Sequence, residues 1–266
     1  LSPSAQQWQA FCQQICADWQ VSLQTKAVEV SASGSLEAAA RSRRYQAFRE
    51  LLQADELLLM AHHLDDQIET VLFRLTRGAG AQGLAGIPAQ RKLGCGRLLR
   101  PLLQYGRAEL AAYAAAHQLS WQDDESNSNA QHDRNYLRHQ VLPQIEQRWP
   151  DYRQSWRKSL ALLSENDDLQ KQLGAIDLRD ATTEMGGISL AVMQDLGSAR
   201  QRNLLRCWLQ QLGVSDPGWN TLHQFVNEFI PGVSPGSKFA LDICDVYQHK
   251  AQLFAVRTLP EFGLEA

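Results

Sequence analysis

Cysteine is scarce in this sequence, and its five residues follow no disulfide framework. The count is odd, the positions are scattered and no Cys-x-x-Cys pair occurs, which argues against a disulfide-stapled scaffold and favours a reducing cytoplasm. Cys12 and Cys16 lie on an apolar stripe at helical spacing. Because small thiols commonly fill helix faces, we expect both in a core rather than at a metal or redox site, together with the rest of the stripe: Trp8, Phe11, Ile15 and Trp19.

Long apolar runs are also missing. No stretch approaches the roughly 18 residues needed to cross a bilayer, and no signal-peptide pattern opens the chain, so we expect a cytoplasmic protein without a membrane partner. The net charge of −3 is too small for a general polyanion binder. The 266 residues are 44% hydrophobic and 21% charged, which is ordinary for a globular protein. At about 150 residues per domain, we expect two domains, 1–168 and 169–266.

Acidic residues are absent between residues 91 and 107, where five basic residues occur. Two further basic clusters lie in the first part of the chain, whereas acids concentrate later. Each cluster is either a solvated helix face or a contact for a phosphate backbone, and the occurrence of three favours the second interpretation. The clusters comprise Arg41, Arg43, Arg44 and Arg49; Arg91, Lys92, Arg97, Arg100 and Arg107; and Arg134, Arg138, Arg148, Arg153, Arg157 and Lys158.

The pattern of apolar residues predicts alternating strands and helices in the first part of the chain. This order implies right-handed crossovers and a parallel sheet. Ser35 is a candidate N-cap, and Pro143 and Pro150 are expected to bend or interrupt a helix that begins at Asp133. We expect helices at 4–19, 36–53, 64–76, 107–117 and 151–173, strands at 21–30, 57–61 and 119–121, and a short strand or extended arm at 97–103. The remainder, rich in Gly and Pro turns, is expected to form a smaller domain of helices with hairpin strands at 238–242 and 252–256.

Ionisable side chains crowd the point where strand 57–61 ends and helix 64–76 begins. His62, Asp66 and Glu69 share one side of that helix, opposite the apolar stripe, and Asp65 lies at the edge. Open α/β sheets bind ligands at this edge. The simpler alternative is helix capping, because acids are favoured in a first turn and His63 is a possible cap. The glycine-rich segment 78–86 is expected to be an irregular loop whose backbone N–H groups approach a ligand.

Five collinear segments carry a resemblance to a known family. They are Ala61-His-His-Leu-Asp-Asp-Gln-Ile-Glu-Thr70 with Arg77-Gly-Ala-Gly80, Gly83-Leu-Ala-Gly86, Glu37-Ala-Ala-Ala-Arg41 with Arg44-Tyr45, Leu99-Arg-Pro-Leu-Leu103, and Asp124-Glu-Ser-Asn127 followed by Asp133-Arg-Asn-Tyr-Leu-Arg138. The chain resembles the bacterial tRNA(Ile)-lysidine synthetases, which are PP-loop ATP pyrophosphatases. The resemblance implies an α/β fold with a parallel flavodoxin-like (adenine nucleotide alpha-hydrolase-like) sheet, helices on both faces, and a smaller, mostly helical substrate-binding domain.

The resemblance also implies a reaction. These enzymes use ATP and Mg²⁺ to activate carbon 2 of the wobble cytidine in a CAU-anticodon tRNA(Ile) by adenylation, which releases pyrophosphate. The side-chain amine of free L-lysine then displaces AMP. Phe73, an apolar residue on the polar side of its helix, weakly agrees with the homodimer that the family implies. The implied catalytic residues are Asp66, Glu69, His62 and Arg77. Arg77, Gly78, Gly80 and Arg44 are implied for ATP, and Arg41, Arg97, Arg100, Arg134, Asn135 and Arg138 for tRNA.

The sequence departs from the family in one respect. It does not contain the Ser-Gly-Gly-x-Asp-Ser loop of the ATP site, and no acceptor-stem domain is expected after Leu259, so we expect this piece alone to be inactive and not to bind ATP in the family's manner. Three alternatives stay open. One is a metal-dependent hydrolase that uses His62, His63, Asp65 and Asp66. The second is a tRNA-thiolating relative, although such enzymes rely on Cys-x-x-Cys pairs. The third is a non-catalytic tRNA-binding module.

Overall fold

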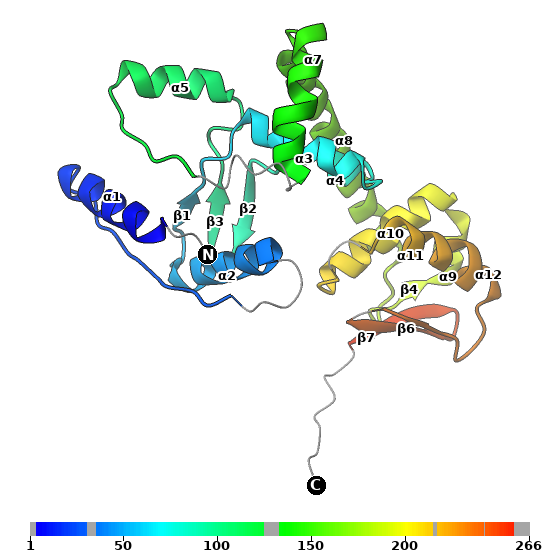
Figure 1. The fold of residues 1–266 in the computed structure, drawn as a ribbon. Helices are drawn as coiled ribbons and strands as arrows, with labels where there is room; N and C mark the ends of the chain where they lie inside the picture. Colours follow the sequence, from blue (N-terminus) through cyan, green and yellow to red (C-terminus); the bar gives the residue numbers. More distant parts are fainter. Residues whose placement is uncertain (1–3, 31–35, 125–132, 215–216, 242, 258–266) are drawn as a thin grey trace. The chain divides into compact units, whose positions relative to one another are not determined.

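The computed structural model describes residues 4–30, 36–124, 133–214, 217–241 and 243–257. The chain divides into two compact units, Leu1–Ala79 with Gly83–Leu160 and Gly80–Gln82 with Ala161–Ala266 (Figure 1). The expected boundary at 168 falls inside a long helix, α8 (Tyr152–Ala181), which contributes residues to both units.

The first unit contains a three-stranded sheet in the order β1-β3-β2. β1 (Leu57–Leu59) pairs in parallel with β3 (Gly96–Leu99), and β2 (Gln90–Leu93) pairs antiparallel with β3. The close pairing of β1 and β3 requires glycine at position 96, since a Cβ there would lie 2.4 Å from the carbonyl oxygen of Glu56. The α/β class is confirmed, and the tight β2–β3 hairpin is a feature that the apolar pattern did not predict.

Helix α2 (Leu36–Leu51) packs on this sheet through buried Tyr45 and half-buried Phe48 (Figure 1). They meet Leu93 and Leu98, which is fully buried at the centre of β3. The sheet therefore holds the end of β1 firmly beside α2. This arrangement sets the position of the residues that follow β1.

Two of the expected strands are not formed. Residues 21–30 and 119–121 have no strand conformation, because neither segment finds a ladder partner among the described residues. The expected core role of the first helix is also wrong. Helix α1 (Ala5–Asp18) buries no residue, Cys12 is exposed, and Trp19 is 65% exposed. No described element covers its apolar stripe. Ser35 lies outside the described residues.

A second small core joins helices from distant parts of the sequence. Leu64 and Ile68 of α3 (Leu64–Leu75) pack against Leu142 of α7 (Leu142–Arg148) and Tyr152 of α8. α7 follows α6 (Asp133–Tyr136) and a π-helical turn, η2 (Leu137–Val141), just before Pro143, the expected place of an interruption. Because a proline cannot donate a backbone hydrogen bond, the change from π-helical to α-helical pitch next to Pro143 breaks few hydrogen bonds. Helix α5 (Arg107–Ala116) completes the unit.

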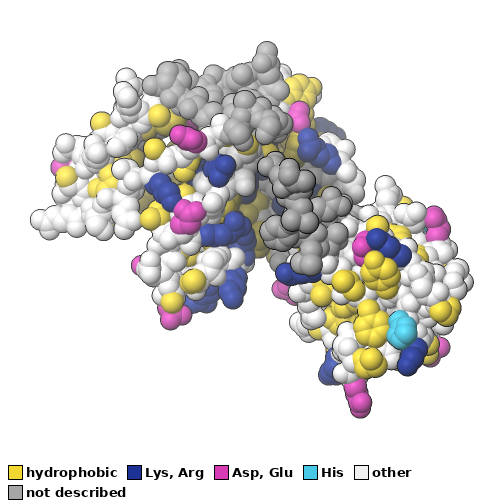
Figure 2. Space-filling model, turned by 90° about the horizontal axis from the view of Figure 1, so that it is seen from below, with side chains coloured by type: hydrophobic (Ala, Val, Ile, Leu, Met, Phe, Trp, Pro, Cys, Tyr) yellow, Lys and Arg dark blue, Asp and Glu magenta, His cyan; other side chains and the backbone are white. Residues whose placement is uncertain are grey.

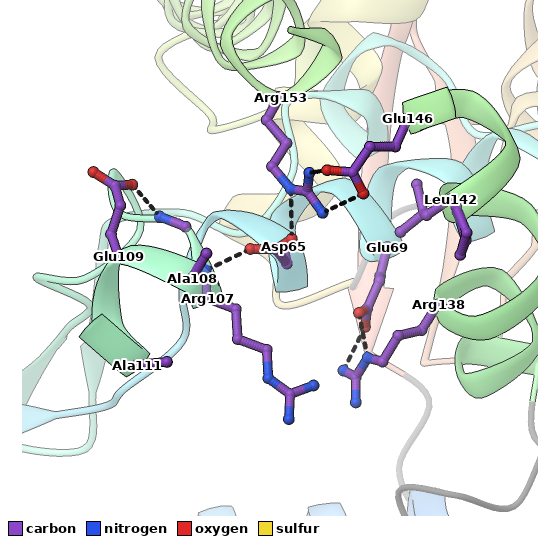
Figure 3. Close-up of a pocket in the computed structure, with 12 residues that line it drawn as sticks. Asp65, Glu69, Arg107, Ala108, Glu109, Ala111, Arg138, Leu142, Glu146 and Arg153 are labelled. Carbon is purple, nitrogen blue, oxygen red and sulfur yellow. Dashed lines mark hydrogen bonds and ion pairs between the residues drawn. The ribbon is translucent and has the colours of Figure 1, made fainter. Parts of the chain in front are cut away.

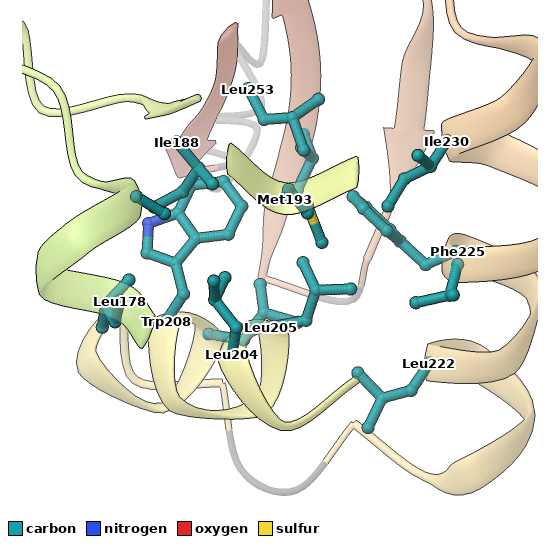
Figure 4. Close-up of a cluster of buried hydrophobic side chains, with 14 of the residues drawn as sticks. Leu178, Ile188, Met193, Leu204, Leu205, Trp208, Leu222, Phe225, Ile230 and Leu253 are labelled. Atoms are coloured by element: carbon teal, nitrogen blue, oxygen red, sulfur yellow. The ribbon is translucent and has the colours of Figure 1, made fainter. Parts of the chain in front are cut away.

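The second unit packs helices against a four-stranded sheet in the order β4-β7-β6-β5. Its core contains Leu204 and Leu205 of α10, together with Phe225 and Leu253 from two other elements (Figure 4). The strands are β4 (Ile188–Ser189), β5 (Lys238–Ala240), β6 (Cys244–His249) and β7 (Gln252–Arg257), and the helical elements are α9 (Leu190–Asp195), α10 (Ser198–Gln211), α11 (Trp219–Gln224), η3 (Phe225–Phe229) and α12 (Ile230–Gly232). The sequence predicted strands matching β5 and β7 but missed β6.

Candidate active site

The first turn of α3 is built by a reciprocal cap. The His63 side chain accepts a hydrogen bond from the backbone N–H of Asp66 at 3.4 Å, and the Asp66 carboxylate accepts one from the backbone N–H of His63 at 2.9 Å. The capping interpretation of this pair is therefore confirmed. The cap uses only one oxygen of the Asp66 carboxylate. The other oxygen lies 3.9 Å from the Arg138 guanidinium, and the side chain is 24% exposed.

One turn further along α3, Glu69 forms a bidentate ion pair with Arg138. Nε and Nη2 of Arg138 donate to the two carboxylate oxygens at 2.7 and 2.9 Å. The Glu69 side chain is only 3% exposed, and the hydrogen bonds that Arg138 donates to it raise the pKa of Arg138. The structure therefore joins two residues that the sequence assigned to separate tasks. Nothing in their spacing predicts this contact across 69 positions.

Asp65 ties three helices together. Its carboxylate accepts a hydrogen bond from the backbone N–H of Arg107, at the start of α5, at 2.7 Å, and one from Nε of Arg153, in α8, at 2.9 Å. Burial raises the pKa of Asp65, but these two hydrogen bonds and the Arg153 charge outweigh burial and hold the pKa below its ordinary value. Asp65 is thus an ionised structural anchor, which its edge position on α3 did not indicate.

A cavity of about 550 Å³ opens beside these carboxylates (Figure 3). Asp65 and Glu69 form one wall, and Ala108, Ala111, Leu142 and Pro143 give it an apolar lining. The guanidinium groups of Arg107 and Arg138 reach toward the same opening (Figure 3). Arg107 makes no side-chain hydrogen bond or ion pair with any described residue, so its charge is available at the rim.

Past the end of β1, a second cluster is strongly basic. Arg41 and Arg100 each donate to the Tyr45 hydroxyl at 3.4 Å, and the Arg91 guanidinium lies 4.8 Å from the centre of the Tyr45 ring. Burial raises the pKa of Tyr45, but the three arginines outweigh burial and lower it. Figure 2 shows Lys and Arg side chains gathered on one face of the first unit.

His62 borders this basic cluster. Its pKa is lowered by burial and by the charge of Arg100, so the imidazole is neutral at pH 7. Its Nδ1 atom is buried without a hydrogen-bond partner, and so is Nε of Arg100. Two orphaned polar atoms beside several guanidinium groups are the features expected where an anionic group binds.

Arg77, which was expected to bind phosphates, lies away from the acids at the start of α3. Arg77 follows the C-terminal end of α3, opposite the end that carries Asp66, and there it stacks over the Phe73 ring at 4.0 Å. It also forms an exposed ion pair with Asp133 at 3.6 Å. The expected irregular loop is partly wrong, because Ala81–Leu84 forms a short helix, α4. Gly78 adopts a positive φ of 72°, and a Cβ at Gly78 or Gly80 would meet no atom within 4 Å.

The residues implied for tRNA binding differ in exposure. Arg97, on β3, is exposed. Arg100 is 4% exposed and donates to the carbonyl of Pro88 at 2.7 Å. Arg134 donates to the Thr70 hydroxyl at 3.4 Å, and Asn135 is 8% exposed. Arg97 is therefore the most accessible of these four.

The described residues provide neither a metal-binding cluster nor a helix that could span a membrane. No group of three or more His, Cys, Asp or Glu side chains in the described parts of the chain is arranged to hold a metal ion. The alternative of a hydrolase with ligands at His62, His63, Asp65 and Asp66 thus finds no support, since His63 and Asp66 cap a helix and Asp65 is held by two arginines. None of the helices described is both long enough and apolar enough to span a membrane.

Comparison with known proteins adds two domain matches. The PP-loop domain model matches residues 1–145, and the TilS substrate binding domain matches residues 188–254. A tRNA(Ile)-lysidine synthase of Pseudomonas aeruginosa is 46% identical over 80% of this chain and 50% of its own length. Its Serratia proteamaculans namesake is 44% identical over 86% of this chain and 52% of its own length. The chain thus spans about half the length of the curated relatives it matches. The resemblance noted from the motifs is confirmed.

Proposed function

We propose that this chain, which belongs to the PP-loop domain family, is part of a ligase that attaches lysine to carbon 2 of the wobble cytidine in CAU-anticodon tRNA(Ile). The observation that carries the proposal is the group at the start of α3. There, a partly exposed carboxylate, Asp66, lies beside the buried Glu69–Arg138 pair. The names of the relatives and the TilS domain match support the same reaction. We further propose a cytoplasmic location and a domain boundary near residue 168.

The first half-reaction needs ATP, and the basic cluster has a fitting donor set. Guanidinium groups bind phosphates through charge-assisted hydrogen bonds, and the orphaned atoms of His62 and Arg100 lack acceptors. Arg41 and Arg44, which both influence the pKa of His62, would hold phosphates there. ATP supplies the adenylyl group that activates the cytidine oxygen. Mg²⁺ would arrive with ATP, because magnesium usually binds phosphates together with only one or two carboxylates.

The second half-reaction needs lysine with a neutral side-chain amine. A carboxylate that takes up the ammonium proton must be reachable and not already neutralised by a partner. Glu69 meets the second condition poorly, since both of its oxygens are bound by Arg138. Asp66 meets both better, because only one oxygen faces Arg138, at 3.9 Å, and the side chain is partly open. We therefore propose that Asp66 binds the lysine ammonium group and accepts its proton, and that Glu69 holds Arg138 in position.

The substrate tRNA would cover the basic face of the first unit. Arg97 is exposed there and would contact phosphates, whereas Arg134 and Asn135 would act from more buried positions. The homodimer that the family implies stays a prediction, and sedimentation of the protein would test it.

The function is tested by ATP-dependent incorporation of labelled lysine into a CAU-anticodon tRNA(Ile) transcript, with a GAU-anticodon transcript as control. The complete gene product should label the first transcript only, and only when ATP is present. Tight binding of the tRNA without lysine incorporation would instead support a non-catalytic tRNA-binding module and would overturn the proposal.

A further inference from the structure

A second cavity lies at the turn between α7 and α8, in the first unit and apart from the site above. It has a volume of about 550 Å³ and is walled mainly by aromatic side chains, Trp149, Tyr152 and Trp156. Arg148, Asp151 and Ser155 form its polar rim. None of these residues takes part in the proposed adenylation or lysine transfer. The function proposed above therefore assigns no role to this cavity.

The floor of this cavity is rigid. Tyr152 is 3% exposed and belongs to the small core with Leu64 and Leu142. Its ring meets Trp156 edge-on, with centroids 5.2 Å apart. The backbone of the turn is also fixed, because Trp149 donates to the carbonyl of Ile145 at 2.8 Å and accepts from the N–H of Tyr152 at 3.0 Å. A ligand that enters here meets a preformed aromatic surface.

The outer wall of the cavity is an exposed indole. Trp149 is 61% exposed, although its indole is among the largest apolar groups of the chain. The Arg148 guanidinium lies 6.0 Å from its ring centre, on the edge of cation–π range. An exposed indole flanked by a guanidinium is typical of surfaces on which a nucleobase stacks while the cation meets the adjacent phosphate.

The charges around the cavity favour a polyanion. Arg148, Arg157 and Lys158 have no carboxylate partner among the described residues, and all three are exposed. Arg157 donates only to the carbonyl of Gln104, at 3.4 Å, so its charge is not neutralised. Between residues 148 and 158 the one acid is Asp151. An apolar peptide partner would gain nothing from this excess of positive charge.

We propose that the α7–α8 cavity binds one unstacked base of the substrate tRNA, with the base against Trp149 and the neighbouring phosphate on Arg148. The proposal rests on the tRNA substrate proposed above and adds a contact outside the reacting centre. Such a contact raises affinity for tRNA without touching the chemistry. It also assigns a role to Arg148, a member of the third basic cluster that the reaction site does not use.

The test compares variants of the complete gene product for binding of a fluorescently labelled CAU-anticodon tRNA(Ile) transcript. Trp149→Ala should weaken binding by roughly 5- to 150-fold, the equivalent of the 1–3 kcal/mol that one stacked base contributes. Trp149→Phe should retain most of the affinity because a ring remains. Trp121→Ala is the matched control, since Trp121 is also largely exposed, at 58%, but lies outside the cavity. It should bind like the wild type.

Arg148→Gln gives an independent readout. It should reduce the slope of log Kd against log salt concentration by roughly 0.7, as expected for one lost phosphate contact on a single strand. Unchanged affinity and slope in both variants would overturn the inference. So would a dimer that dissociates in Trp149→Ala while tRNA affinity stays constant, because the cavity would then join two copies. A wild-type protein that binds tRNA but transfers no lysine would refute the proposed function alone.

Discussion

Replacing Asp65 should loosen the junction of α3, α5 and α8, although Asp65 is not assigned to the chemistry. In Asp65→Ala, the backbone N–H of Arg107 loses its acceptor, which costs about 1–3 kcal/mol for a buried donor. The charge-assisted bond from Arg153 is also lost, normally about 1.5–3 kcal/mol. The second loss is discounted because Arg153 is 35% exposed and keeps Glu146 at 2.5 Å. We expect a total of about 2–4 kcal/mol.

Asp65→Asn should cost less, about 1–2 kcal/mol, because the amide oxygen still accepts from Arg107. Because the chain forms two compact units, a single unfolding transition is a poor measure of this loss of stability. Hydrogen exchange of the α5 amides reports the opening free energy of this junction directly. Asp180→Asn is the control, since Asp180 is exposed beside Arg179 and should change little.

The same substitution has a defined pH dependence. The pKa of Asp65 lies below its ordinary value of 3.8 in the folded protein, so its contribution is complete above that value and is lost as the pH falls through the folded pKa. The difference between wild type and Asp65→Asn should therefore stay constant at pH values well above 3.8 and shrink as the pH falls below that value. A difference independent of pH, or an Asp65→Ala variant within about 0.5 kcal/mol of wild type, would refute the reasoning.

Three further predictions concern other parts of the chain. Glu69→Gln should lower the opening free energy of α3 by about 1–3 kcal/mol, because Arg138 loses a charged partner, and hydrogen exchange of α3 would show no change if the ion pair were incidental. Arg41→Gln should raise the KM for ATP by about 10- to 100-fold with tRNA affinity little changed, and the reverse pattern in steady-state kinetics would move Arg41 to the tRNA surface. Leu204→Ala, at a position with no exposed surface, should destabilise the second unit by about 2–5 kcal/mol in urea unfolding, whereas a smaller loss would mean that the α10 core relaxes.

The elements that the sequence predicted best are those with strong local periodicity. The apolar stripe of α3 and the short run of β1 were sufficient to place His62, Asp66 and Glu69 at the end of a strand. β6 was missed because its inward positions include Gln248, which is buried although it is polar. Strand 21–30 failed for the opposite reason, since alternation alone forms no strand without a neighbouring strand to pair with.

The sequence predicted only part of the candidate site. A local pattern showed the carboxylates, but it could not show that Glu69 is neutralised by Arg138 or that Asp65 is held by Arg153, since these partners lie 69 and 88 positions away. Such contacts depend on tertiary packing. They distinguish the two candidate acids, because Arg138 occupies Glu69 whereas Asp66 remains available.

Asp66, at the start of α3, is expected to act on lysine and not on the nucleotide. A single-turnover reaction of Asp66→Asn in the complete gene product tests it most directly, with ATP, CAU-anticodon tRNA(Ile) and labelled lysine. We predict that the variant releases pyrophosphate at close to the wild-type rate while lysine incorporation falls by about 100-fold or more, the usual contribution of a general base. Loss of pyrophosphate release, or lysine incorporation at the wild-type rate, would contradict the account.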